Sequence, residues 1–217
     1  CVNLGLEICF ENVWFAYTDN HWVLKDISFN VSRGQSLALV GATGAGKSSV
    51  INILTRFYEL NKGRVKVDGV DIKDIELASL RDNIGVVLQD VFLFSDSIIN
   101  NVTINNPLIS KDTVVEAAKM VGAHEFIMNL PGQYEYNVKE RGAMLSVGQR
   151  QLIAFMRVYV YNPSILVLDE ATSNIDTESE EIIKHATSVL THGRTSIIIA
   201  HRLSTIQNAD KILVLDK

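Results

Sequence analysis

The octapeptide Gly41-Ala42-Thr43-Gly44-Ala45-Gly46-Lys47-Ser48 constrains the fold of this chain more than any other stretch. It fits the pattern G-x-x-x-x-G-K-[ST] and lies between an apolar run, 36–40, and a segment expected to be helical from about Lys47. Glycines let backbone N–H groups turn towards a phosphate, and a helix N-terminus adds positive potential. The stretch therefore predicts a strand, a phosphate-binding loop and a helix in series. The alternative is an ordinary glycine turn.

The pattern along the chain predicts an α/β fold. The first third alternates strand-like runs with turns, and the segment around Asp68-Gly69 has the signal of a β-hairpin. From about residue 90 to 161 apolar residues recur at helical spacing, including one long stretch at 111–130. The last part alternates strands and helices again, which predicts a parallel sheet. We therefore expect an antiparallel β part, a parallel core and an inserted helical subdomain.

Composition excludes several classes of protein. The 217 residues are 47% hydrophobic, enough for one sizeable core, and the net charge of −5 argues against a nucleic-acid partner. Two cysteines, Cys1 and Cys9, are too few for a disulfide framework and favour a reducing compartment. The longest apolar runs are strand-sized, so we expect any transmembrane domain to lie outside this chain.

A pair of carboxylates, Asp169 and Glu170, ends the apolar strand 165–169. Because neighbouring strand residues point to opposite sides, we expect the two carboxylates to have different roles. Asp169 is placed to hold Mg²⁺ directly or through water, and Glu170 to orient or deprotonate a water in line with a γ-phosphate. Two alternatives stay open: both acids serve the metal, or both are simply solvated.

A second helix start, at Leu145-Ser146-Val147-Gly148-Gln149, has exposed N–H groups and a hydroxyl suited to an anion. No lysine or metal ligand accompanies it, so by itself it is half of a phosphate site. The alternative is a plain helix N-cap.

Taken in order, these motifs resemble the nucleotide-binding domain of an ATP-binding cassette (ABC) transporter over essentially the whole chain. The phosphate loop is followed by the strand-end Gln89, the signature 145–149, Asp169-Glu170, the loop containing Ser173 and Asp176, and His201. The resemblance implies one ATPase domain over 1–217, with a P-loop NTPase (RecA-like) core and a mixed, mostly parallel sheet. Residues 1–89 and 162–217 would form the nucleotide-binding core and 90–161 the helical signature subdomain.

The same resemblance implies how the cofactors ATP and Mg²⁺ are held. Glu170, His201, Gln89 and Lys47 would be catalytic, with His201 contacting the γ-phosphate; Ser48, Gln89 and Asp169 would serve the metal. Tyr17 matches the aromatic that stacks on adenine, although Trp22 is a competitor and Tyr17 could simply pack in its strand. ATP would be bound by Tyr17, Gly41, Thr43, Gly44, Ala45, Gly46, Lys47, Ser48, Ser49 and Gln89.

The resemblance also implies that two domains pair head to tail, with like or unlike chains. Leu145, Ser146, Val147, Gly148 and Gln149 would then act in trans on the γ-phosphate held by the partner. Ser173 and Asp176 would belong to the D-loop, although Asp176 could also cap the following helix. Val147 stands where a glycine is usual, and a valine disfavours positive φ and adds bulk beside the phosphate.

Two stretches, 89–102 and 139–149, resemble those of exporters rather than importers. In exporters the first packs against helices from the membrane domain, so Val91, Phe92, Leu93 and Phe94 would form a docking surface. The alternative is a buried turn. The implied location is the cytoplasmic face of a membrane, such as the bacterial inner membrane.

The resemblance thus implies an ATPase that powers export through ATP-driven dimerisation and hydrolysis-driven separation. Three rivals are a soluble relative acting on DNA or the ribosome, an ATP-binding sensor without turnover, and a phosphate-loop kinase. The transported substrate is not encoded in these residues.

Overall fold

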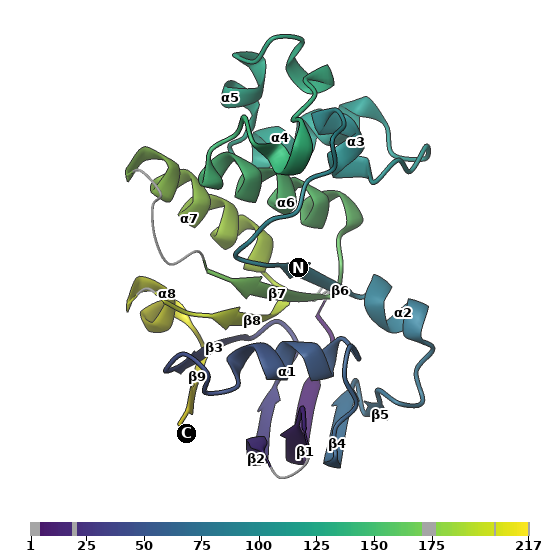
Figure 1. Cartoon of the computed structure of the whole chain (residues 1–217), viewed down its shortest axis with the longest axis vertical. Helices are drawn as coiled ribbons and strands as arrows, with labels where there is room; N and C mark the ends of the chain where they lie inside the picture. The colour runs from purple at the N-terminus through teal and green to yellow at the C-terminus, as the bar shows by residue number, and fades with distance from the viewer. Residues whose placement is uncertain (1–4, 19–20, 171–176, 202, 217) are drawn as a thin grey trace. The chain divides into compact units, whose positions relative to one another are not determined.

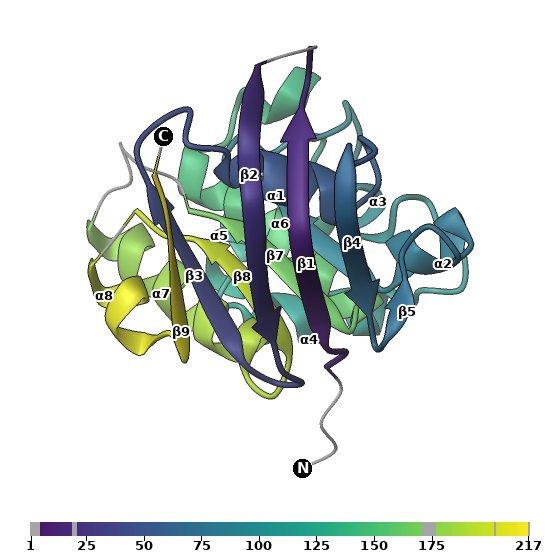
Figure 2. The same ribbon diagram turned by 90° about the horizontal axis from the view of Figure 1, so that it is seen from below.

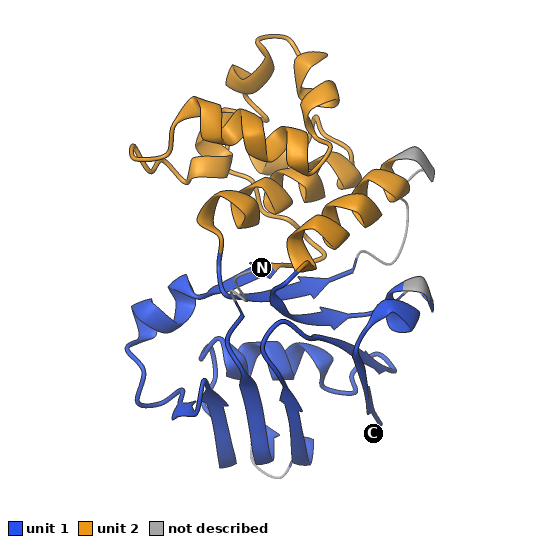
Figure 3. Cartoon of the chain, turned by 180° about the vertical axis from the view of Figure 1, so that it is seen from behind, with its two compact units in different colours: residues 1–86, 163–170, 193–217 blue, residues 87–162, 171–192 orange. Residues whose placement is uncertain are grey.

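The computed structural model of the chain describes residues 5–18, 21–170, 177–201 and 203–216. Within them the chain forms two compact units (Figure 3), the first of residues 1–86, 163–170 and 193–217, the second of residues 87–162 and 171–192.

An antiparallel sheet in unit 1 has the strand order β2-β1-β4-β5. The strands β2, β1 and β4 lie side by side in Figure 2. At the β4–β5 turn Asp68 and Gly69 have φ of 53° and 82°, as a tight hairpin with both central residues left-handed requires. The predicted antiparallel part is thus confirmed. Its strands are β1 (Ile8–Ala16), β2 (Trp22–Val31), β4 (Lys62–Val67) and β5 (Val70–Asp71).

The second sheet of unit 1 has the order β6-β7-β8-β3-β9. The pairs β7–β8, β8–β3 and β3–β9 are all parallel, which confirms the mostly parallel core. Both faces of the sheet are covered at β8, whose five residues are all buried, whereas the edge strand β9 is buried at only one of its five residues. The strands are β3 (Ser36–Gly41), β6 (Ile84–Val87), β7 (Ile165–Asp169), β8 (Thr195–Ile199) and β9 (Lys211–Leu215).

Helix α1 (Lys47–Leu54) lies between the two sheets (Figure 1). Val50 and Ile53 of α1 are fully buried in one apolar cluster with Phe10 of β1 and Leu39 of β3. This cluster fixes the helix that follows the phosphate loop. Two further helices of unit 1 are α2 (Leu77–Asp82) and α8 (Leu203–Asn208).

Unit 2 is helical, as predicted for the inserted subdomain. The stretch 111–130, expected to be helical, forms two helices: Gly122, at φ +77°, follows the end of one helix and a second begins at His124. A side chain at Gly122 would also meet Ile182, 2.8 Å away. The elements are α3 (Ile98–Thr103), α4 (Lys111–Met120), α5 (His124–Met128), the 3₁₀ turns η1 (Gln133–Glu135) and η2 (Glu140–Gly142), α6 (Val147–Tyr161) and α7 (Thr177–Thr191).

Helix α7 belongs to unit 2, whereas the sequence analysis placed it in the α/β core. Its buried face is centred on Ile183, Ala186 and Leu190. Gly148 of α6 lies against this helix, since a Cβ there would be 3.1 Å from the Cβ of Ser179. Close packing between α6 and α7 therefore extends the helical unit beyond the predicted range 90–161. None of the helices described is long and apolar enough to cross a bilayer.

Candidate active site

The phosphate loop leaves β3 at Gly41 and enters α1 at Lys47. Gly44 and Gly46 have φ of 82° and 96°, a conformation that glycine adopts readily. A side chain at Gly46 would also lie 2.7 Å from Cδ2 of Leu24, a core residue of β2. The loop conformation therefore needs glycine for two separate reasons.

Lys47 folds back over this loop. Its Nζ donates hydrogen bonds to the carbonyl oxygens of Gly41, at 2.7 Å, and Ala42, at 3.0 Å. The ammonium group is thereby held above the loop whose N–H groups are expected to face a phosphate. Thr43, Gly44 and Ser48 are exposed, whereas Ala45 and Ser49 are buried.

Strand topology brings the predicted acidic and histidine residues to the end of the sheet where this loop starts. Strands β7, β8 and β3 are parallel neighbours, so Asp169, the residues after Ile199 and Gly41 share one edge. Nε2 of His201 lies 3.9 Å from Oδ1 of Asp169. Such an edge, beyond the carboxyl ends of parallel strands, is where α/β proteins bind ligands.

Asp169 and Glu170 have different neighbours. The backbone N–H of His201 donates to Oε2 of Glu170 at 2.9 Å, and the hydroxyl of Thr205 in α8 donates to Oε1. Asp169 instead faces the imidazole of His201. This difference favours a division of labour between the acids. Thr205 was missed by the sequence analysis, because only the fold brings α8 to the end of β7.

Tyr17 and Trp22, the two aromatic residues considered for stacking on adenine, have different surroundings in the structure. Trp22 packs edge-on against Trp14, with ring centroids 5.4 Å apart, and Lys62 lies over both rings. The phenol oxygen of Tyr17 lies 3.0 Å from Oγ of Ser49 on α1. Tyr17, which is 46% exposed, is therefore the ring beside the phosphate loop.

The signature segment forms the N-terminus of α6 in unit 2. Oγ of Ser146 accepts the N–H of Gln149 at 3.1 Å, and Oε1 of Gln149 accepts the N–H of Ser146 at 3.0 Å. This reciprocal capping box leaves the hydroxyl hydrogen of Ser146 able to donate outwards. Leu145 and Gly148 are buried.

Val147 is the first residue of α6 and is not among the residues with positive φ. The expected conflict between valine and a left-handed backbone does not arise, because a helical position suits either residue. Its side chain is half-buried and lines a cavity of about 470 Å³ in unit 2. The other lining residues are Gln89, Asp90, Val91, Phe92, Arg141, Ala143 and Arg150.

The residues of the predicted docking segment, 91–94, differ in how far they are buried. Phe92 and Phe94 are 56% and 50% exposed and contact each other edge-on, whereas Leu93 is buried. Leu93 is thus buried, as in the alternative, although residues 91–94 form no turn, and docking through this segment stays a prediction.

A polar hub, formed by the side chains of Asn101 and Arg157, hydrogen-bonds the backbone of this segment. The sequence analysis did not predict it. Asn101, which has no exposed surface, bonds the backbone N–H and carbonyl of Phe94. Arg157 of α6 donates to the carbonyl of Phe92 at 3.0 Å and to Oδ1 of Asn101 at 3.1 Å. Burial lowers the pKa of the Arg157 guanidinium below its ordinary value. The hub therefore joins the docking segment to the signature helix.

Gln89 is exposed and belongs to unit 2. Its predicted place beside the metal thus stays a prediction. Ser173 and Asp176, predicted for the D-loop, lie outside the described residues.

Comparison with known proteins decides the family. The profile of the ABC transporter family matches residues 24–173, which is most of the chain. The chain belongs to the ABC transporter family. The matched region includes the phosphate loop, the signature and Asp169-Glu170.

Individual relatives support the assignment of this chain to the ABC transporter family. It is 50% identical over 210 residues to an uncharacterised ABC transporter ATP-binding protein, YknV, of Bacillus subtilis, covering 97% of this chain and 35% of the relative. It is 49% identical over 211 residues to a putative multidrug export ATP-binding/permease protein of Staphylococcus aureus, covering 97% and 36%. The chain thus spans about a third of the length of these relatives.

Among solved structures, the domain is similar to a bacterial Atm1-family ABC exporter with ATP bound. The TM-score is 0.90 at 42% sequence identity, covering 98% of this chain and 37% of that one. The predicted fold and family are confirmed by these relatives, and two of the three proteins compared are named as exporters.

Proposed function

We propose that this chain is the ATP-hydrolysing domain of an exporter, and that it drives transport by closing on a second such domain. The observation that carries the proposal is the shared edge of β3, β7 and β8, where the phosphate loop, Asp169, Glu170 and His201 meet. Exporter relatives support the branch.

The donor chemistry of this edge fits Mg²⁺. The Ser48 hydroxyl and the Asp169 carboxylate are hard oxygen ligands, and the predicted Gln89 would add an amide oxygen. Among the described residues no group of three or more His, Cys, Asp or Glu side chains could hold a metal unaided. This fits an ion bound largely through substrate phosphates, whose negative charge it would neutralise when bound.

The chain's own groups then have distinct tasks. The loop N–H groups and Lys47 bind the phosphates, and His201 contacts the γ-phosphate. Glu170, whose carboxylate is held by the His201 N–H and Thr205, accepts the proton of the attacking water.

Ser146 and Gly148 would complete the site of a second domain, because the N-terminus of α6 offers anion-binding groups but no phosphate-loop lysine. The exposed Phe92 and Phe94 would dock a transmembrane domain at the cytoplasmic face of a membrane, such as the bacterial inner membrane. Exporter relatives argue against the DNA, ribosome and kinase alternatives.

The test is the solution mass of a Glu170→Gln variant, by light scattering, with and without Mg-ATP. Slowed hydrolysis should trap a closed dimer, and adding Ser146→Arg should abolish it by blocking the trans phosphate contact. Ser110→Arg is a matched control, because Ser110 caps α4 through the N–H of Thr113 in the same way. It should leave the dimer intact.

Wild-type turnover completes the test. We expect ATP hydrolysis that falls at least about a hundredfold in Glu170→Gln, since a general base contributes at least that factor. ATP binding without any turnover in the wild-type chain would favour the sensor instead. A Glu170→Gln variant that binds ATP tightly and stays monomeric would exclude self-pairing.

A further inference from the structure

The phenol group of Tyr17 is anchored to helix α1 by two hydrogen bonds. Nδ2 of Asn52 donates to the phenol oxygen at 3.1 Å, so the phenol hydrogen is available to Oγ of Ser49, 3.0 Å away. Both partners lie on the helix that begins with Lys47. The helix that carries the phosphate-binding lysine thus also fixes the position of an exposed aromatic ring.

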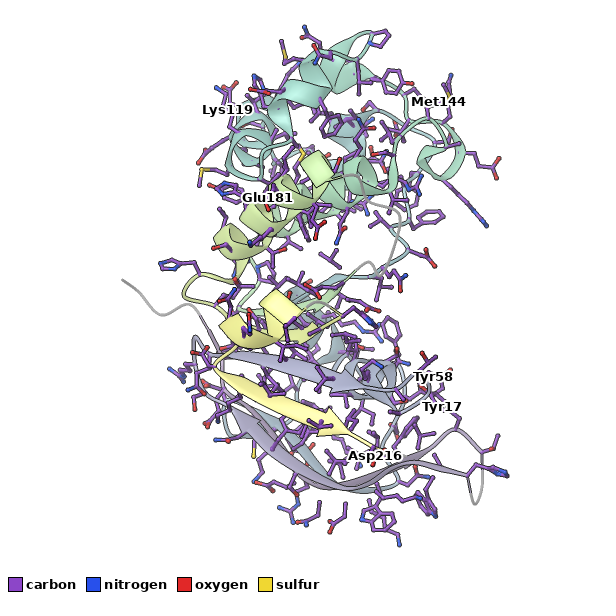
Figure 4. The ribbon with its side chains drawn as sticks, turned by 90° about the vertical axis from the view of Figure 1, so that its left-hand side faces the viewer. Tyr17, Tyr58, Lys119, Met144, Glu181 and Asp216 are labelled. Carbon is purple, nitrogen blue, oxygen red and sulfur yellow. The ribbon has the colours of Figure 1, made fainter. Side chains whose placement is uncertain are left out.

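Asn52 also holds a second tyrosine through its backbone. Its carbonyl oxygen accepts the N–H groups of Phe57, at 2.9 Å, and Tyr58, at 3.3 Å. The Tyr58 ring meets the Tyr17 ring at 89°, with centroids 4.9 Å apart, and the two lie next to each other in Figure 4. One residue therefore sets the positions of both exposed rings.

The buried ring of Phe15 supports the pair from the core. Its centroid lies 4.7 Å from that of Tyr17, at an interplanar angle of 80°, and 5.9 Å from that of Tyr58. Edge-to-face contacts of this kind favour one ring orientation over others. Nearly half of each tyrosine nevertheless stays exposed, 46% for Tyr17 and 48% for Tyr58.

An exposed ring fixed in this way is suited to stacking a flat base. Ordering a side chain on binding costs free energy, and a ring that is already ordered avoids that cost. We infer that Asn52, assisted by Ser49, is a positioning residue for nucleotide recognition, which holds the Tyr17 ring ready to stack on adenine. The inference rests on the proposed function, because it assigns Tyr17 to the base of the bound ATP.

The experiment compares the binding of ATP and of inorganic triphosphate, both with Mg²⁺, by calorimetry. Tyr17→Phe removes the hydroxyl and keeps the ring, whereas Asn52→Leu removes the donor and keeps the carbonyl that holds Tyr58. In Asn52→Leu we expect the Kd for ATP to rise about fivefold, the equivalent of one lost hydrogen bond. In Tyr17→Phe we expect a rise at least as large, because the bond to Ser49 is lost as well. The Kd for triphosphate, which has no base, should not change.

The double variant and a matched control sharpen this result. Tyr17→Phe with Asn52→Leu should bind ATP about as well as Tyr17→Phe alone, because the phenol that Asn52 would bond is already absent. Tyr159→Phe removes a phenol that bonds Glu116 in unit 2 and should leave both affinities unchanged.

Each other outcome overturns a specific statement. Wild-type affinity for ATP in both single variants would overturn the role of Asn52 and leave the proposed function standing. A parallel loss of ATP and triphosphate binding in Asn52→Leu, with neither lost in Tyr17→Phe, would show that Asn52 supports the loop instead. A wild-type chain that binds neither compound would overturn the proposed function itself. If Asn52→Leu fails to fold, wild-type affinity for ATP in Tyr17→Phe still overturns the inference, because that variant has lost the Asn52 bond.

Discussion

Gly46 illustrates how a single residue serves both the core and the site. Its φ of 96° is unfavourable for residues with a side chain, and the Cβ of any such residue would press on Leu24. Gly44 has a similar φ of 82°, but nothing lies within 4 Å of the position of its Cβ. A side chain at Gly44 would therefore cause backbone strain alone, whereas a side chain at Gly46 would cause both backbone strain and steric crowding.

We predict that Gly44→Ala lowers the free energy of unfolding by roughly 1–2 kcal/mol, the cost of left-handed backbone in an L-residue. Gly46→Ala should cost that amount and about 1–3 kcal/mol more, because Leu24 is packed in the core and cannot move freely. Urea denaturation of both variants measures the difference. Equal losses would show that crowding at Leu24 contributes nothing.

At the scale of secondary structure, α6 combines a structural and a functional N-terminus. The capping box between Ser146 and Gln149 satisfies backbone N–H groups that an unpaired helix end would leave without partners. The same serine is the one expected to meet a phosphate of a second domain. Stability and the proposed recognition would therefore depend on one hydroxyl.

We predict that Ser146→Ala lowers the free energy of unfolding by about 1 kcal/mol through loss of the cap. Ser146→Thr should retain most of that stability, because threonine caps helices nearly as well. Chemical denaturation measures both. An unchanged stability in Ser146→Ala would mean that the cap contributes little at this helix.

Another element-scale feature is the tie between the β4–β5 turn and the loop after β2. The guanidinium of Arg33 hydrogen-bonds the Asp68 carboxylate at 3.0 Å, and the N–H of Glu7 donates to it at 3.3 Å. These bonds, that of Arg33 first, hold the pKa of Asp68 below its ordinary value of 3.8. The carboxylate therefore stabilises the fold only where it is ionised.

We predict a small loss of stability in Asp68→Asn at pH 7, because exposed ion pairs contribute little. The stabilisation by Asp68 is present above pH 3.8 and is lost as the pH falls through the lowered pKa of the folded state. The wild-type and variant curves of stability against pH should therefore converge in acid. A difference that persists unchanged at low pH would contradict the ion-pair explanation.

At the scale of the whole molecule, we expect ligand binding to raise the free energy of unfolding. A ligand that binds the folded state alone, at a hundred times its Kd, adds about 2.7 kcal/mol to the free energy of unfolding. The proposed site lies in unit 1, whose two sheets share one core with α1. Nucleotide binding should therefore protect that core.

We predict that saturating Mg-ATP raises the free energy of unfolding by about that 2.7 kcal/mol. Lys47→Ala should remove most of the gain, because the phosphates lose their cation, and chelating the magnesium should reduce it. Thermal unfolding with and without nucleotide gives the measurement. A gain that survives Lys47→Ala would place the nucleotide elsewhere.

The sequence by itself determined the strand, loop and helix around Gly41–Ser48, the hairpin at Asp68-Gly69 and the capped start of α6. Each of these is encoded in a few adjacent residues, through backbone preferences, turn chemistry and apolar spacing. Adjacent residues cannot specify which distant segments meet. Tyr17 lies beside α1 while Trp22 packs against Trp14, through contacts between distant segments, and Thr205 reaches Glu170 through the pairing of β7 with β8. The tertiary structure alone decided these neighbours, as it decided the packing of α7 in unit 2 and the anchoring of Tyr17 by Asn52.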